Sequence, residues 1–136
     1  MSFVALAALI SIMFTYAVSA AERPAAITSE RAEALVWALP EIKAWAKFIG
    51  AQSKGKARAM TIVEPEAPAI VEGKRYWSVS FGEDDGDHTH RWQTFMVGVD
   101  GGAILVDTDA PDEYLTLKQW RVREHPMDRI RGAHAP

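Results

Sequence analysis

The stretch Arg75-Tyr76-Trp77-Ser78-Val79-Ser80-Phe81 decides the fold, because every second side chain in it is large and apolar. Successive side chains of a β-strand point to opposite faces. The apolar face then carries Trp77, Val79 and Phe81, and the more polar face carries Tyr76, Ser78 and Ser80. This contrast is typical of an antiparallel strand that is buried on one side.

Segments on either side of this strand complete a predicted antiparallel sheet. After a polar turn at residues 82–87, residues 91–99 form the return strand. Its two faces carry Phe95, Val97 and Val99 on one side, and Trp92, Thr94 and Met96 on the other. Asp100-Gly101-Gly102 predicts a hairpin turn, because these residues tolerate positive φ, and residues 103–106 follow as a short strand. Residues 60–63 are a further strand candidate, which ends before Pro65.

A helix is predicted before the sheet, with Thr28 or Ser29 as its cap and Gly50 at its end. Apolar residues recur there every three or four positions: Ala32, Leu35, Val36, Leu39, Ile42, Ala46 and Ile49. Pro40 interrupts this stripe. We expect either a kink or two short helices, with Pro40 at the first position of the second.

The predicted fold class is therefore α+β, with an N-terminal Pro-kinked helix packed on a three- to four-stranded antiparallel sheet. Its core would contain the aromatic residues Trp37, Trp45, Phe48, Trp77, Phe81 and Phe95. Residues 28–120 form the expected single domain. Residues 114–120 fit either a last strand or a short helix, and residues 121–136 are expected to form a disordered basic tail.

The first 20 residues predict a cleaved signal peptide, because they are apolar and contain no charged side chain. Val18-Ser19-Ala20 places small residues before a cut at Ala21, and residues 21–27 then form an extended tether. The alternative is an uncleaved anchor, since the segment is almost long enough to span a bilayer. With cleavage we expect a periplasmic or secreted protein without stable membrane insertion.

Composition excludes several classes of function. The 136 residues carry a formal net charge of −3, which gives no indication of a nucleic-acid partner. Because the chain contains no cysteine, it has no disulfides, no thiol nucleophile, no thiolate metal site and no lipid-acceptor residue.

Three stretches together resemble the PepSY domain family and its periplasmic relatives. They are Ala34-Leu35-Val36-Trp37-Ala38-Leu39-Pro40-Glu41-Ile42-Lys43, Gly73-Lys74-Arg75-Tyr76-Trp77-Ser78-Val79-Ser80-Phe81, and Phe95-Met96-Val97-Gly98-Val99-Asp100-Gly101-Gly102-Ala103-Ile104-Leu105-Val106. The resemblance spans roughly residues 30–120. It implies a cystatin-like plan of a helix on an antiparallel sheet and a non-catalytic binding or inhibitory module, and it carries over no active-site residue.

The outer face of the hairpin is the candidate partner-binding surface. If the two long strands pair, five side chains crowd together there: Tyr76, Arg91, Trp92, Gln93 and Thr94. Exposed aromatic and arginine side chains on a rigid sheet are typical of binding surfaces. Alternatively, residues 114–120 or the tail cover this face.

The acidic hairpin tip offers a second candidate site. His88 and His90 leave the same face of a strand, and with Asp87 they could bind a divalent metal. The alternative is a solvated turn built from Asp and Gly residues. Ser78 and Ser80 lie in the middle of a strand and His125 lies in the tail, so we expect no enzyme and no cofactor.

The sequence thus predicts an exported, non-catalytic module that binds or inhibits a cell-envelope or secreted protein, as protease and lysozyme inhibitors do. A small periplasmic metal-binding protein that uses His88 and His90 is the first alternative. A degenerate hydrolase is the second.

Overall fold

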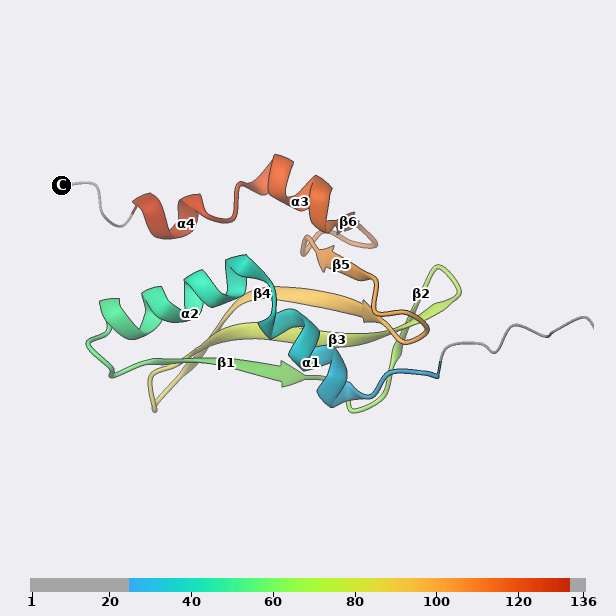
Figure 1. The fold of residues 1–136 in the computed structure, drawn as a ribbon, viewed down its shortest axis with the longest axis horizontal. Coiled ribbons are helices and arrows are strands. Elements are labelled where there is room, and N and C mark those ends of the chain that lie inside the picture. Colours follow the sequence, from blue (N-terminus) through green and yellow to red (C-terminus); the bar gives the residue numbers. More distant parts are fainter. Residues whose placement is uncertain (1–24, 133–136) are drawn as a thin grey trace, which may run out of the picture.

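The computed structural model describes residues 25–132, which form an α+β fold with helices packed against an antiparallel sheet (Figure 1). The predicted signal peptide at residues 1–20 lies outside these residues. The elements in chain order are α1 (Ser29–Trp37), α2 (Pro40–Gln52), β1 (Arg58–Val63), β2 (Ala69–Val71), β3 (Lys74–Asp84), β4 (Thr89–Gly98), β5 (Ile104–Asp107), β6 (Tyr114–Thr116), α3 (Leu117–Glu124) and α4 (Asp128–Arg131).

Pro40 separates two helices, as the second of the two alternatives predicted. It is the first residue of α2, where its missing N–H costs no helical hydrogen bond. Thr28 caps α1, since its hydroxyl accepts a hydrogen bond from the Arg31 backbone N–H at 3.2 Å. Just before α1, the Ile27 N–H donates to the Val99 carbonyl at 2.9 Å. The described end of the expected tether is therefore attached to the sheet.

Within the described residues the sheet has six strands, so the expectation of three or four was too low. Its order is β1-β3-β4-β5-β6, and β2 pairs with the N-terminal part of β3. The β2–β3 hairpin turns at Glu72 and Gly73, which both have positive φ. The strands β2 and β6 have three residues each. Such short strands leave too few alternating positions for a sequence pattern to show.

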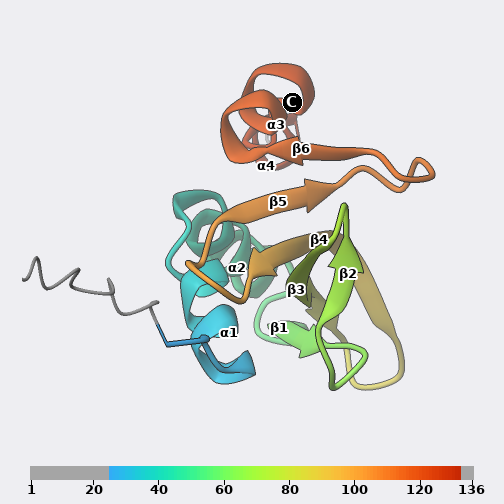
Figure 2. The same cartoon turned by 90° about the vertical axis from the view of Figure 1, so that its right-hand side faces the viewer.

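One layer of aromatic and aliphatic side chains joins the helices to the sheet. Figure 2 shows the sheet curving around α1 and α2, with α3 and α4 beside β6. Trp45 is 1% exposed and its ring lies 5.9 Å from the Phe81 ring and 5.9 Å from the Trp120 ring. Phe81 and Phe95 are fully buried, whereas Trp37, Phe48 and Trp77 are only half-buried.

Residues 121–132 are not part of a disordered tail, so for these residues the expectation was wrong; residues 133–136 lie outside the described residues. Residues 114–120 begin as β6 and continue as α3, so both alternatives for them are partly right. Thr116 starts α3 with a capping box, in which it exchanges hydrogen bonds with Gln119. The Trp45 indole N–H donates to the Pro126 carbonyl at 3.0 Å. Because the anchoring groups lie 81 positions apart, no local pattern in residues 121–136 revealed this packing.

We searched the described residues for a helix of membrane-spanning length and apolarity, and none of them qualifies.

Candidate functional site

A β-bulge in β4 determines which side chains of this strand face the helices. Phe81 of β3 pairs with Gln93, but the next residue, Gly82, pairs with Arg91, so that Trp92 is the extra residue. In a bulge of this kind two consecutive side chains point to the same side of the sheet. Trp92 therefore lies on the helix side, where its ring is 5.5 Å from the Trp45 ring.

Gly82 is required opposite this bulge. A Cβ atom at position 82 would lie 2.2 Å from the backbone carbonyl oxygen of His90, which is far inside van der Waals contact. The glycine thus lets the two strands approach closely at the point where the register shifts.

The bulge divides the five residues that were expected to share the outer face. The expectation that Trp92 faces outward was wrong, because Trp92 packs on the core with Trp45, Phe48 and Phe81. Thr94 is 6% exposed, and its hydroxyl lies 2.9 Å from that of Ser80.

Tyr76 is also separated from the rest of the predicted surface. It pairs with Gly98, six positions along β3 from the residue that pairs with Arg91. Six residues of strand span about 20 Å. Tyr76 is therefore too distant, and Thr94 too buried, to share a binding surface with the other three residues. Arg91, Trp92 and Gln93 adjoin one another.

Those three residues line a groove between the bulged strand and the helices. It consists of three adjoining hollows of about 320, 450 and 190 Å³, all of which include Arg129 in their lining. We call this set the β4 groove. Its residues come from α2, β3, β4, β5, the β5–β6 loop and the C-terminal helices. They include Phe48, Glu83, His90, Arg91, Trp92, Gln93, Asp109, Glu124 and Arg129.

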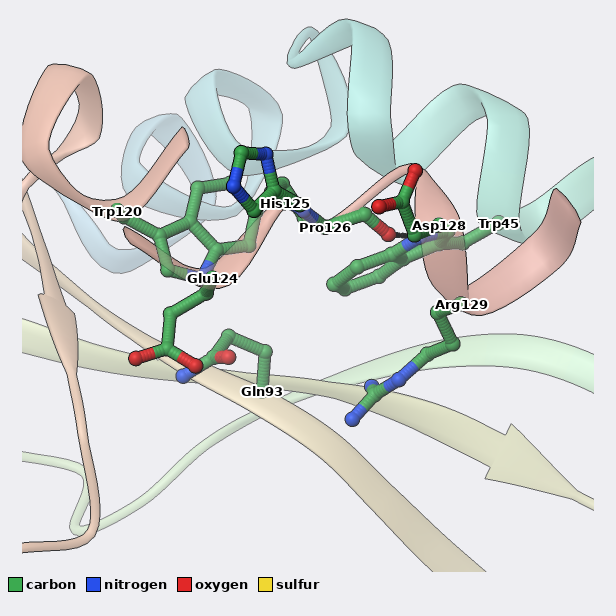
Figure 3. A pocket seen from close by; sticks show the side chains of 8 residues that line it. All are labelled: Trp45, Gln93, Trp120, Glu124, His125, Pro126, Asp128 and Arg129. Carbon is green, nitrogen blue, oxygen red and sulfur yellow. Dashed lines mark hydrogen bonds between the residues drawn. The ribbon is translucent and has the colours of Figure 1, made fainter. Parts of the chain in front are cut away.

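Arg129 occupies the centre of the β4 groove. Its guanidinium carbon lies 5.1 Å from the centroid of the Trp45 ring and 5.0 Å from that of the Trp92 ring, within cation–π distance of both. One terminal N–H donates to the Trp92 carbonyl at 3.1 Å. Figure 3 shows the Arg129 side chain extending past Trp45, with Gln93 and Glu124 at the same hollow.

Within residues 25–132 no carboxylate matches the positive charge of Arg129. Among residues 25–132 no ion pair includes Arg129, and burial lowers the pKa of its guanidinium. The guanidinium stays charged at neutral pH, because the pKa of arginine is too high for deprotonation in proteins. A partly desolvated cation with unused donors favours an incoming anion.

Several other charged side chains around the groove have partners of opposite charge. Arg91 pairs with Asp109 at 3.5 Å. Glu124 pairs with Arg123 at 3.1 Å, and Asp128 pairs with Arg131 at 3.5 Å. The rim charges are therefore offset by these ion pairs, whereas the charge of Arg129 at the centre of the groove is not balanced within the described residues.

The hairpin tip is organised around Asp85 rather than Asp87. One Asp85 carboxylate oxygen accepts hydrogen bonds from the backbone N–H groups of Asp87 and His88, and these bonds lower the pKa of Asp85. The rings of His88 and His90 lie 6.3 Å apart, and His90 Nε2 is 4.0 Å from the other Asp85 oxygen. In the part of the chain that the structure describes, no three His, Cys, Asp or Glu side chains are grouped to hold a metal ion.

Sequence reasoning did not identify Arg129 or Trp120 as part of a site, because both fall near or within the expected tail. The sequence did contain a weak indication of a helix at Trp120. Thr116 and Gln119 have the spacing of a capping box, which predicts a helix start just before Trp120. Arg129 has no comparable signal, since its position depends on contacts with distant tryptophans.

No family model, curated protein or solved structure matched this chain when it was compared with each set. The resemblance to PepSY domains therefore remains a prediction.

Proposed function

We propose that this chain is an exported, non-catalytic binding module that holds a carboxylate-bearing segment of a cell-envelope or secreted protein in the β4 groove. The uncharged apolar residues 1–20 support export, and the resemblance to PepSY domains supports a binding role.

The observation that carries this proposal is the unmatched Arg129 guanidinium. It lies against both the Trp45 and the Trp92 ring and donates to one backbone carbonyl, so donors of its planar fork remain for a carboxylate. Arginine and tryptophan are the residue types that most often dominate the energetics of protein interfaces. A carboxylate bound there would restore the electrostatic stabilisation that Arg129 loses through partial burial.

The neighbouring residues support the same surface. Arg91, Trp92 and Gln93 all line the β4 groove. The Gln93 amide already donates to the Asp107 carbonyl at 2.6 Å, which holds its side chain in a defined orientation. A pre-oriented surface binds its partner at a lower entropic cost than a mobile one.

The test is affinity capture from a cell-envelope extract of the source organism with three immobilised forms of the chain. These are the natural sequence, Arg129→Gln and Arg131→Gln. Arg131 serves as the matched control because it lies on the same short helix, lines none of the three hollows and is paired with Asp128. We expect a protein that the natural chain and Arg131→Gln retain and that Arg129→Gln loses. Equal retention by all three forms would show that Arg129 is not the binding centre.

Fold integrity is checked on the same samples by circular dichroism. Arg129→Gln removes cation–π contacts that contribute about 1 kcal/mol, so the variant should remain folded at 25 °C. Loss of the protein partner by a folded Arg129→Gln variant is then an effect on binding.

A further inference from the structure

We infer that the partner segment in the β4 groove carries an acidic residue and a lysine two positions apart. Arg129 binds the carboxylate, and Asp109 and Glu124 attract the ammonium group. This inference rests on the proposed function and specifies the chemistry of the partner. It concerns the smallest of the three hollows, of about 190 Å³, which we call the acidic hollow.

The acidic hollow is lined by more acidic than basic residues. Asp107, Asp109 and Glu124 line it together with a single basic residue, Arg129. A ligand that is only anionic would be attracted by the arginine and repelled by the surrounding carboxylates. A ligand that is only cationic would be attracted by the carboxylates and repelled by the arginine. The lining therefore favours a ligand that carries both charges close together.

The acidic side chains retain negative charge for such a ligand. Arg123 is the ion-pair partner of Glu124, but it also pairs with Glu113, so one guanidinium serves two carboxylates. The pair of Arg91 and Asp109, at 3.5 Å, joins two exposed side chains, and solvent screens such a pair strongly. The lysine of a partner segment therefore meets a favourable electrostatic environment in the acidic hollow.

Arg129 and Glu124 are held apart, although they carry opposite charges and line the same two hollows. Among residues 25–132 these two side chains form no ion pair with each other. Arg129 instead donates to the Trp92 carbonyl at 3.1 Å, and Figure 3 shows its guanidinium apart from the Glu124 carboxylate. A bridging ligand can therefore meet both charges without first breaking an ion pair between them.

An extended peptide can present both charges on one side. Side chains two positions apart in an extended segment point the same way, and their Cα atoms lie about 7 Å apart. Adjacent side chains point to opposite sides and cannot enter the same hollow together. The acidic hollow is smaller than a typical small-molecule site, so it fits the charged ends of two side chains better than a whole free ligand. Lysine suits this space because its ammonium group is compact.

The experiment uses the whole chain, labelled with ¹⁵N and titrated with four short peptides. The indole N–H signals of Trp92 and Trp120 are followed, because both side chains line the acidic hollow. Acetyl-Glu-Ala-Lys-amide carries both charges at the inferred spacing. Acetyl-Glu-Ala-Gln-amide lacks the ammonium group, acetyl-Gln-Ala-Lys-amide lacks the carboxylate, and acetyl-Glu-Lys-Ala-amide has the wrong spacing. We expect saturable shifts with the first peptide and about fivefold weaker binding of each of the other three.

Variants connect each charge of the peptide to residues of the chain. In Arg129→Gln the peptides Glu-Ala-Lys and Gln-Ala-Lys should bind equally, because the carboxylate has lost its partner. In the double variant Asp109→Asn/Glu124→Gln the peptides Glu-Ala-Lys and Glu-Ala-Gln should bind equally, because the ammonium group has lost its partners. Arg131→Gln should leave all four affinities unchanged. The backbone N–H spectrum of each variant also reports whether it is folded.

Two kinds of result would overturn the inference. One is equal binding of the four peptides by the natural chain, or no binding of Glu-Ala-Lys. The other is a preference for Glu-Ala-Lys that remains unchanged in Arg129→Gln and in the double variant.

The inference and the proposed function fail separately. If capture of a protein depends on Arg129 but the lysine does not improve peptide binding, the inference is wrong and the proposed function stands. If neither result depends on Arg129, both are wrong.

Discussion

Replacing Arg121 by methionine removes the cationic partner of the Glu41 carboxylate. In the folded chain the Arg121 Nε donates to one Glu41 oxygen at 2.5 Å, and a terminal nitrogen donates to the other at 3.1 Å. This bidentate pair connects α2 to α3. The side chain of Glu41 is only 7% exposed, so the carboxylate has little access to water once its partner is lost.

The expected cost follows from these exposures. Removing one partner of a fully buried ion pair costs roughly 3 to 5 kcal/mol. The Arg121 side chain is 41% exposed, so solvent already screens part of this interaction, and we expect a loss of about 2 kcal/mol in the free energy of unfolding. For a chain of this size that loss lowers Tm by roughly 8 °C.

The pH dependence gives a second, independent signature. Burial raises the pKa of Glu41. The hydrogen bond and charge of Arg121, together with a backbone hydrogen bond at Glu41, outweigh burial, so the pKa lies below its ordinary value of 4.5. In the natural chain this stabilisation is present above about pH 4.5 and is lost as the pH falls through the folded-state pKa. In Arg121→Met the hydrogen bond and charge of Arg121 are lost while burial and the backbone hydrogen bond at Glu41 remain, so the pKa of Glu41 rises above its value in the natural chain. The stability difference between the two proteins should therefore narrow from pH 7 to pH 4.

The assay is urea unfolding followed by tryptophan fluorescence at pH 7, 5 and 4. Arg123→Met is the matched control on the same helix. Its partners Glu113 and Glu124 are 38% and 48% exposed, and such surface pairs contribute less than about 1 kcal/mol each. Equal losses for Arg121→Met and Arg123→Met, or a stability difference that is independent of pH, would refute this account of the Glu41 pair.

Three further substitutions test the bulge and the C-terminal helix by thermal and urea unfolding. Gly82→Ala places a Cβ 2.2 Å from the His90 carbonyl oxygen and should lower the free energy of unfolding by about 2 kcal/mol or more. Gly50→Ala is the control: its Cβ meets nothing within 4 Å, so this substitution should not destabilise the chain. Trp92→Ala should cost about 2 kcal/mol because the half-buried ring packs on the core, and a change below about 0.5 kcal/mol would instead indicate a surface position. Thr116→Ala removes the capping box of α3 and should cost about 1 kcal/mol; an unchanged Tm would mean that the cap is dispensable.

The candidate site was only partly predictable from the sequence. Arg91, Trp92 and Gln93 were identified from their residue types, and all three line the β4 groove. Their directions were not predictable, because strict alternation assigned Trp92 to the outer face. A bulge adds one residue to one strand only. The sequence of a single strand does not show with which residues of its partner it pairs, so the bulge could not be predicted.

Local patterns in the sequence determined the α+β class, the helix break at Pro40, the β3–β4 hairpin and the turn after β4. These features depend on neighbouring residues, through proline geometry, side-chain alternation and the backbone freedom of glycine. Tertiary structure alone decided the place of the C-terminal helices and the direction of Trp92. Arg129 reaches the centre of the groove because the rings of Trp45 and Trp92, 84 and 37 positions away in the chain, form its binding surface. Contacts over such separations arise from the packing of the whole core, which no local pattern encodes.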